Sequence, residues 1–325
     1  MKIIALEEHY SYAALREDVP QHPTRSPNNP YMEEVRTKLA DLGEARLADM
    51  DENGISMQIL SVSAMDESLA DEIANETFIV KDVNDRLAAR ISCNPDRYIG
   101  LATLPLRHPE EAARELDRCI TELGYVGAVV NGTIDGQFLD HPRFEPVLEA
   151  AEKLDAPIYI HPAPPIKPIF DAYYAGLPGE ASQALSISGW GWHTEVGLHA
   201  LRLILAGVFD HHPHLQVIIG HMGEFLPYCL DRSDLLLSRA APHLQKRLRD
   251  YFLENFHITT SGYFSLPPFL CALQMVGAER ILFAVDYPYS PNAKGKEFLE
   301  SLPIPKDQLE LIAHGNAEKL LKLRA

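Results

Sequence analysis

Residue types that bind metals stand at the ends of several apolar runs in this sequence. The first case is Glu7-Glu8-His9, which follows the apolar run Lys2–Leu6. Side chains alternate along a strand, so Glu7 and His9 share one face and Glu8 points away. A carboxylate beside an imidazole is half of a divalent-metal site, although an isolated Glu-x-His is more often two solvated side chains. The later apolar runs decide between these interpretations.

The later runs do end in comparable residues. Together with Glu7 and His9 they supply two carboxylates and three imidazoles, a mixed oxygen and nitrogen set that suits Zn or Mn. Ionisable residues placed at random would not recur after so many apolar runs, so the pattern predicts a metal site. The residues at these later ends are Asn131, His161, His221 and Asp286.

Eight short, β-branched apolar runs alternate with helical patterns along the 325 residues. Runs that are apolar on both faces suit a parallel sheet covered by helices, and eight such units are typical of an α/β (β/α)8 TIM barrel. A doubly wound open sheet is the alternative. In a barrel the strand ends meet at one mouth, which would bring the polar residues together. The predicted strands are Lys2–Leu6, Ser56–Val62, Tyr98–Leu104, Tyr125–Val130, Pro157–Ile160, Leu215–Gly220, His257–Thr260 and Arg280–Val285.

Helical patterns separate these strands. Two stretches, residues 11–32 and 163–192, lack a regular pattern, and the second is rich in Pro, Gly, Tyr and Trp, as in a lid or an interface. No repeat or linker divides the chain, so we expect one domain over residues 1–325. The predicted helices are Glu44–Glu52, Leu69–Arg90, Pro109–Leu123, Phe144–Leu154, Thr194–Val208, Glu224–Arg239, Pro267–Val276 and Asp307–Leu323.

The composition excludes several classes of partner. The chain has 29 basic and 46 acidic residues, and its net charge of −17 argues against nucleic acid or an anionic membrane. No apolar run approaches the ~20 residues needed to span a bilayer, and the start lacks the layout of a signal peptide. The four cysteines show no C-x-x-C spacing and are expected to be reduced thiols. We therefore expect a cytoplasmic protein.

The remaining histidines carry weaker signals. His211, His212 and His214 precede a predicted strand, which places them at the other end of a barrel, and we expect them to be solvated. His193 and His199 are six residues apart near one predicted helix, so they lie on different faces and predict no site.

Several motifs together resemble the amidohydrolase superfamily and, within it, the non-oxidative aromatic acid decarboxylases, the branch that includes γ-resorcylate and 2,3-dihydroxybenzoate decarboxylases. The resemblance covers nearly the whole chain, and Glu-x-His in place of the His-x-His of most superfamily hydrolases is fairly specific for this branch. The motifs are A-L-E-E-H at 5–9, G-A-V-V-N-G at 127–132, I-H-P at 160–162, G-H-M-G-E at 220–224, E-N-F-H-I-T-T-S-G at 254–262 and R-I-L-F-A-V-D-Y-P at 280–288.

The resemblance implies one divalent ion, Zn or Mn, with a hydrogen-bonded pair of His221 and Glu224 beside it. It also implies that Asp286 shuttles a proton, and that relatives assemble as dimers or tetramers. Asn131, Arg232 and Tyr289 are the candidate substrate contacts, although Arg232 is equally well explained as a surface residue. The implied metal ligands are Glu7, His9, His161 and Asp286.

The implied reaction is decarboxylation of a small ortho-hydroxy aromatic carboxylic acid, with protonation of the ring carbon and release of CO2 and a phenol. The sequence departs from the resorcylate enzymes at Ala163-Pro164-Pro165, where they carry a basic and an amide residue, so the ring substituents stay open. A metal-dependent hydrolase of lactones or amides, with Asp286 as base, is the alternative. A non-catalytic metal-binding barrel is the third interpretation.

Overall fold

The computed structural model of the chain describes residues 1–15, 30–64 and 75–323. A strand of the structure corresponds to each predicted strand, with its ends shifted by a few residues. The first strand continues beyond its predicted end to Tyr10, so Glu7 and His9 lie within it and not after it. The strands are β1 (Ile4–Tyr10), β2 (Met57–Val62), β3 (Tyr98–Gly100), β4 (Ala128–Asn131), β5 (Ile158–His161), β6 (Val217–Ile219), β7 (Phe256–Thr259) and β8 (Ile281–Leu282).

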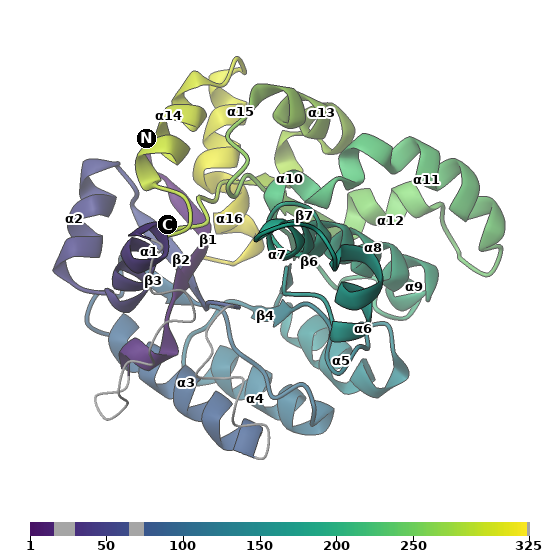
Figure 1. The fold of residues 1–325 in the computed structure, drawn as a ribbon, viewed down its shortest axis with the longest axis horizontal. Helices are drawn as coiled ribbons and strands as arrows, with labels where there is room; N and C mark the ends of the chain where they lie inside the picture. The colour runs from purple at the N-terminus through teal and green to yellow at the C-terminus, as the bar shows by residue number, and fades with distance from the viewer. Residues whose placement is uncertain (16–29, 65–74, 324–325) are drawn as a thin grey trace.

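The strands form a closed parallel barrel. Parallel pairing joins β1 to β3 in chain order and, separately, β4 to β8. Backbone hydrogen bonds close both gaps: Ala102 N donates to Gly127 O at 2.8 Å beside β3 and β4, and Leu6 N donates to Phe283 O at 3.1 Å between β1 and β8. Figure 1 shows the strands near the centre with helices around them. The predicted (β/α)8 barrel is confirmed, and the open sheet is excluded because it would leave two edges unpaired.

An irregularity in β1 determines which of its side chains face the barrel interior. Ala5 pairs with Gln58, but Glu8 pairs with Leu60, so β1 contains one residue more than β2 over this span. An extra residue of this kind reverses the alternation of side chains after it. Glu7 therefore points inward, where it contacts residues of β5 and β7. Glu8 accepts hydrogen bonds from the backbone that follows β8 instead, at Val285 N and Tyr287 N.

Helices cover the barrel, and some of them differ from the predictions. A helix at Pro30–Ala40 was not predicted, because Pro30 was assigned to the excursion 11–32 although proline is well suited to the first turn of a helix. Residues 16–29 and 65–74, which include parts of that excursion and of the predicted helix Leu69–Arg90, lie outside the described residues. The longer helices are α1 (Pro30–Ala40), α2 (Glu44–Glu52), α3 (Glu76–Ile91), α4 (Pro109–Thr121), α5 (Glu145–Leu154), α8 (Gly191–Leu205), α11 (Leu226–Ala240), α12 (Leu248–Asn255), α13 (Leu266–Val276) and α14 (Asn292–Ser301).

Three further predictions need correction. The stretch 163–192 is not irregular throughout, since it contains the short helices α6 (Lys167–Ile169), η5 (Phe170–Tyr174) and α7 (Ala181–Ser186). The last predicted helix is divided by a π-helical turn into α15 (Lys306–Glu310), η7 (Leu311–Gly315) and α16 (Asn316–Leu320). His212 is not solvated: it is buried, and its two ring nitrogens lie 2.9 Å from Glu145 and 3.2 Å from Glu152.

Two other expectations can be compared with the structure. The four cysteines are free thiols, as predicted. Among the described residues, no helix combines the length and the apolar character that a membrane crossing requires.

Candidate active site

Four predicted metal ligands meet inside one end of the barrel. One potential ligand atom from each of them lies within 4.8 Å of those of the other three. Nε2 of His9 is 3.2 Å from Oδ1 of Asp286, and Nε2 of His161 is 3.4 Å from Oε1 of Glu7. β1 supplies Glu7 and His9, β5 ends at His161, and Asp286 follows β8, so the barrel itself brings residues distant in sequence together. The group consists of Glu7, His9, His161 and Asp286.

The chemistry of this group fits a divalent cation. Oε1 of Glu7 and Nε2 of His9 are buried without a hydrogen-bond partner among the described residues, which is costly unless another ligand satisfies them. Burial, with the neighbouring His9 and His221, holds the pKa of His161 well below its usual range, so its imidazole is neutral, as metal binding requires. Two carboxylates and two imidazoles are a ligand set that Zn and Mn accept.

Hydrogen bonds orient the imidazoles of His161 and His9 for metal binding. Nδ1 of His161 lies 2.7 Å from the carbonyl oxygen of Pro162, which can only accept, so Nδ1 carries the proton and the lone pair of Nε2 faces Glu7. Nδ1 of His9 lies 3.2 Å from Oγ of Ser61, which can accept from it in the same way. Fixing a ligand histidine through its second nitrogen is typical of metal centres.

Two hydrogen bonds orient the carboxylate of Glu7 as well. Its Oε2 accepts hydrogen bonds from the hydroxyl of Tyr159, in β5, and from Oγ1 of Thr259 at 3.0 Å, in β7. Burial raises the pKa of Glu7, which shows how unfavourable this charge is without a cation beside it. Gly220 leaves the necessary space, because a Cβ there would lie 2.7 Å from the Tyr159 hydroxyl and 2.8 Å from Glu7 Oε2.

His221 and Glu224 form the predicted hydrogen-bonded pair. They lie in the short turn α10 (His221–Glu224), not at the start of a long helix as predicted for Glu224, and both have positive φ, of 48° and 51°. Nδ1 of His221 lies 2.8 Å from Oε1 of Glu224, and Nε2 of His221 faces Asp286 Oδ2 at 3.8 Å. Burial opposes the charged imidazolium, but the Glu7 and Glu224 carboxylates raise the pKa of His221 well above its ordinary value.

His193 is a site residue that the sequence argument missed. Its Nδ1 lies 2.7 Å from Oε2 of Glu224, so the carboxylate stands between two histidines, and His193, His221 and Glu224 form a second cluster of potential ligand atoms. Burial alone would raise the pKa of Glu224, but His221 and His193 hold it below its ordinary value. His193 belongs to a helix and follows no strand, so the strand-end pattern could not identify it. His199 faces elsewhere, as predicted, and its Nε2 accepts from Leu139 N at 2.9 Å.

The three predicted substrate contacts differ in position. Asn131 ends β4 in register with His161, and its Oδ1 is buried without a hydrogen-bond partner among the described residues. The ring of Tyr289 lies 5.7 Å from that of His9, and its hydroxyl lies 2.6 Å from Oγ of Ser63. Arg232 is exposed on α11, and no hydrogen bond or ion pair joins its side chain to another described residue.

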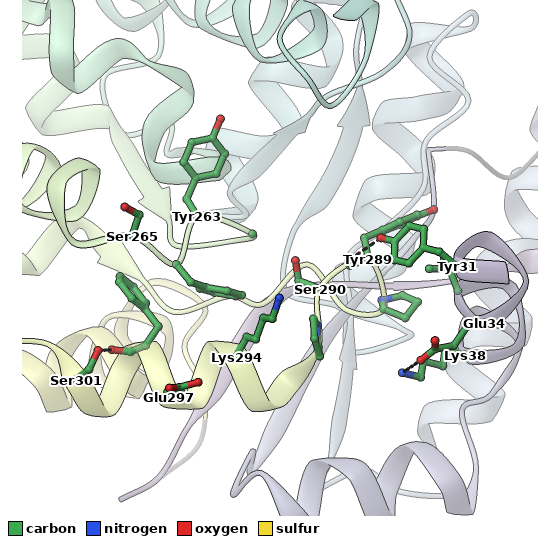
Figure 2. A pocket seen from close by; sticks show the side chains of 16 residues that line it. Tyr31, Glu34, Lys38, Tyr263, Ser265, Tyr289, Ser290, Lys294, Glu297 and Ser301 are labelled. Carbon is green, nitrogen blue, oxygen red and sulfur yellow. Dashed lines mark hydrogen bonds and ion pairs between the residues drawn. The ribbon is translucent and has the colours of Figure 1, made fainter. Parts of the chain in front are cut away.

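A cavity of about 950 Å³ opens near Asp286. Its wall includes Gly262 and Tyr289, and a Cβ on Gly262 would lie 3.6 Å from Asp286 Oδ2, so the cavity reaches the edge of the ligand group without being lined by it. Figure 2 shows Tyr31 and Tyr289 on one side of this cavity, Tyr263 on the other, and the ammonium of Lys294 pointing toward Ser290 between them. Asp286 is the most exposed of the four ligands, at 17% of its side chain.

Comparisons with known proteins identify relatives of this chain. An amidohydrolase family profile matches residues 18–323. The chain is 37% identical to the decarboxylase orsB of Emericella nidulans, over 99% of this chain and 97% of that protein. It is also 37% identical to a γ-resorcylate decarboxylase of Rhizobium sp., over 98% of each. The crystal structure of a dihydroxybenzoic acid decarboxylase from Polaromonas sp., with bound manganese and the inhibitor 2-nitroresorcinol, matches with a TM-score of 0.87 and 35% identity, over 100% of this chain and 98% of that one.

Proposed function

The chain belongs to the amidohydrolase family, and on this basis we propose that it is a metal-dependent, non-oxidative decarboxylase. Its substrate is a small ortho-hydroxy aromatic carboxylic acid of the dihydroxybenzoate kind, and its products are CO2 and a phenol. The observation that carries the proposal is the placement of Asp286: it is the most accessible member of a buried four-ligand group and lies beside both His221 and the cavity.

Glu7, His9, His161 and Asp286 would hold the ion, which is Mn or Zn. The manganese reported in the Polaromonas relative supports Mn, and the two-nitrogen, two-oxygen ligand set accepts either metal. When bound, the ion supplies Lewis-acid charge stabilisation and a template for an anionic substrate. Such a cation also offsets the net charge of −17, which would otherwise repel a carboxylate.

The residues of the chain then orient the substrate and move one proton. The Asn131 amide and the Tyr289 ring contact the aromatic acid at the mouth of the barrel, and Arg232 stays a weaker candidate because of its exposure. Asp286 gives its proton to the ring carbon that bears the carboxylate. The bond between this carbon and the carboxylate then breaks, its electron pair restores the aromatic ring, and CO2 leaves.

His221 supplies the proton that Asp286 needs. Burial alone would raise the pKa of Asp286, but the neighbouring His221 and His9 hold it below its usual range, so Asp286 must acquire a proton before it can act as an acid. Nε2 of His221 lies 3.8 Å from Asp286 Oδ2 and is the donor placed to provide it. The Glu224 carboxylate, which accepts from Nδ1, orients this imidazole.

We further propose that the enzyme is cytoplasmic and works as a homo-oligomer, a dimer or a tetramer. The stretch 163–192 exposes several large apolar side chains, and we assign this stretch to a contact between copies instead of a lid. Light scattering after size-exclusion chromatography would give the oligomeric state. A monomer at micromolar concentration would refute this assignment. The exposed apolar residues are Ile166, Tyr173, Leu177, Leu185 and Trp190.

Proton NMR in D2O tests the reaction directly. Protein loaded with Mn or Zn is mixed with a panel of ortho-hydroxybenzoic acids, and the small-molecule products are recorded after the protein is removed. We expect a phenol with one deuterium at the carbon that carried the carboxylate. Turnover of a lactone panel with no change in any acid would reassign the same site to hydrolysis.

A further inference from the structure

Glu224 is bound by two histidines, and the proposed mechanism uses only one of them. His221 Nδ1 lies 2.8 Å from one carboxylate oxygen, and His193 Nδ1 lies 2.7 Å from the other. The two imidazole rings are 4.6 Å apart at an angle of 66°, and all three side chains are at least nine-tenths buried. A carboxylate with a single donor could rotate about its last bond, whereas one with a donor on each oxygen cannot do so without losing a hydrogen bond.

The surroundings of His193 determine which of its nitrogens carries a proton. Nε1 of Trp192, which can only donate, lies 3.1 Å from Nε2 of His193, and the carbonyl oxygen of Ser188 lies at the same distance from that nitrogen. A neutral ring that accepts from Trp192 has its proton on Nδ1, and a charged ring has one there as well. Only the neutral form with its proton on Nε2 has no proton on Nδ1. In that form the lone pair of Nδ1 would face a lone pair of Glu224 Oε2 at 2.7 Å, which is repulsive. Nδ1 of His193 is therefore a donor to Glu224.

The helix that carries His193 packs closely against the turn that carries His221. A Cβ on Gly197, in α8, would lie 2.9 Å from the carbonyl oxygen of Glu224, so only glycine allows this approach. Trp190 stacks on Phe225 with centroids 4.9 Å apart and an interplanar angle of 26°. Residues 221–225 all have positive φ, a conformation that surrounding contacts must maintain. Trp190, at the aromatic end of the stretch 163–192, supplies one of those contacts.

We propose that His193 is a positioning residue of this active site. Its Nδ1–H holds the Glu224 carboxylate so that the other oxygen receives Nδ1–H of His221, and this directs Nε2 of His221 toward Asp286. The inference rests on the proposed decarboxylation only for its kinetic test, because the hydrogen bonds themselves can be observed without turnover. Trp192 supports the arrangement through Nε2 of His193.

Two isosteric variants separate this role from simple packing. The side-chain amide nitrogen of Asn occupies the place of Nδ1 of histidine, whereas that of Gln occupies the place of Nε2. We expect His193→Asn to retain kcat within about threefold and His193→Gln to lose on the order of 10–100-fold in kcat, with KM and metal content unchanged, as for other residues that orient a site from outside it. His199→Gln, another buried histidine of α8, is the control and should keep the wild-type kcat.

Imidazole N–H resonances of Zn-loaded protein labelled with ¹⁵N-histidine provide the second measurement. The Nδ1–H signal of His221 should keep its position in His193→Asn and move in His193→Gln. If both variants keep the wild-type signal and kcat, or if both lose kcat equally together with thermal stability, His193 only fills space and the proposal is wrong. If the wild-type protein decarboxylates no acid, the proposed function is wrong. The Nδ1–H resonance of His221 in the two variants then still decides whether His193 positions the Glu224 carboxylate.

Discussion

Nε2 of His9, in the first strand, lies 3.2 Å from Oδ1 of Asp286, which follows the last strand. Closure of the barrel between β1 and β8 therefore also completes the ligand group. Two carboxylates concentrated in one buried site destabilise the fold unless a positive charge is present. Metal binding and folding should thus be coupled in this protein.

Removal of the metal should lower both stability and activity. A ligand that binds only the folded state stabilises it by about 2.7 kcal/mol at a concentration of 100 times Kd, so chelation should lower Tm by several degrees. Decarboxylation should stop and return on addition of Mn. Differential scanning calorimetry and a CO2-release assay before and after dialysis against a chelator check this. Unchanged Tm and turnover in metal-depleted protein would rule out the four-residue centre.

Replacement of Asp286 by Asn should separate binding from chemistry. The amide keeps one oxygen for the ion but has no acidic proton, so we expect near-stoichiometric metal with turnover reduced at least about 100-fold, the lower range for loss of a general acid. Metal content by mass spectrometry and single-turnover rates measure the two effects. Wild-type rates in the metal-loaded variant would show that another group delivers the proton.

Acid should destabilise the protein through buried neutral histidines. Burial lowers the pKa of His199 to about 3, below the value of 6.5 expected when the chain unfolds. The unfolded state then binds more protons below pH 6.5, so this contribution to stability is complete above pH 6.5 and declines as the pH falls toward 3. For one fully buried histidine the loss by pH 5 is about 2 kcal/mol.

His199→Gln should remove that part of the pH dependence. The Gln Oε1 can replace Nε2 as acceptor for Leu139 N but does not titrate in this range. Urea unfolding at pH 7.5 and pH 5 should show a smaller difference in free energy for the variant than for the wild type. Equal differences in the two proteins would mean that protonation of His199 does not oppose folding.

The strand-end pattern predicted much of the fold and of the ligand group. Buried parallel strands are short apolar runs, and a barrel places the residues after them at one mouth, so the position of His161 and Asp286 at this mouth could be predicted from sequence alone. Glu7 and His9 followed from alternation, although the irregularity in β1 that turns them inward left no sequence signal.

Features that depend on tertiary packing could not be predicted. His193 acts through Glu224 because α8 packs on a turn with positive φ, and neither the turn nor the packing is visible in a helical pattern. The same applies to His212, which looked like a loop residue and is buried because α5 supplies two glutamates to it. Pairing between distant elements thus escapes reasoning from local patterns.

Tyr159→Phe should weaken metal binding without changing the ligands. The Tyr159 hydroxyl donates to Oε2 of Glu7. Loss of a hydrogen bond that orients a metal ligand typically lowers metal affinity about 10–100-fold. Tyr98 provides a matched control, because it is also a buried strand tyrosine but its hydroxyl has no hydrogen-bond partner among the described residues. We expect Tyr98→Phe to bind metal as the wild type does. Competition titrations with a chromophoric chelator measure both affinities. Equal affinity in the two variants would show that Glu7 needs no orientation by Tyr159, in which case Thr259, 3.0 Å from the same oxygen, is sufficient to hold the carboxylate.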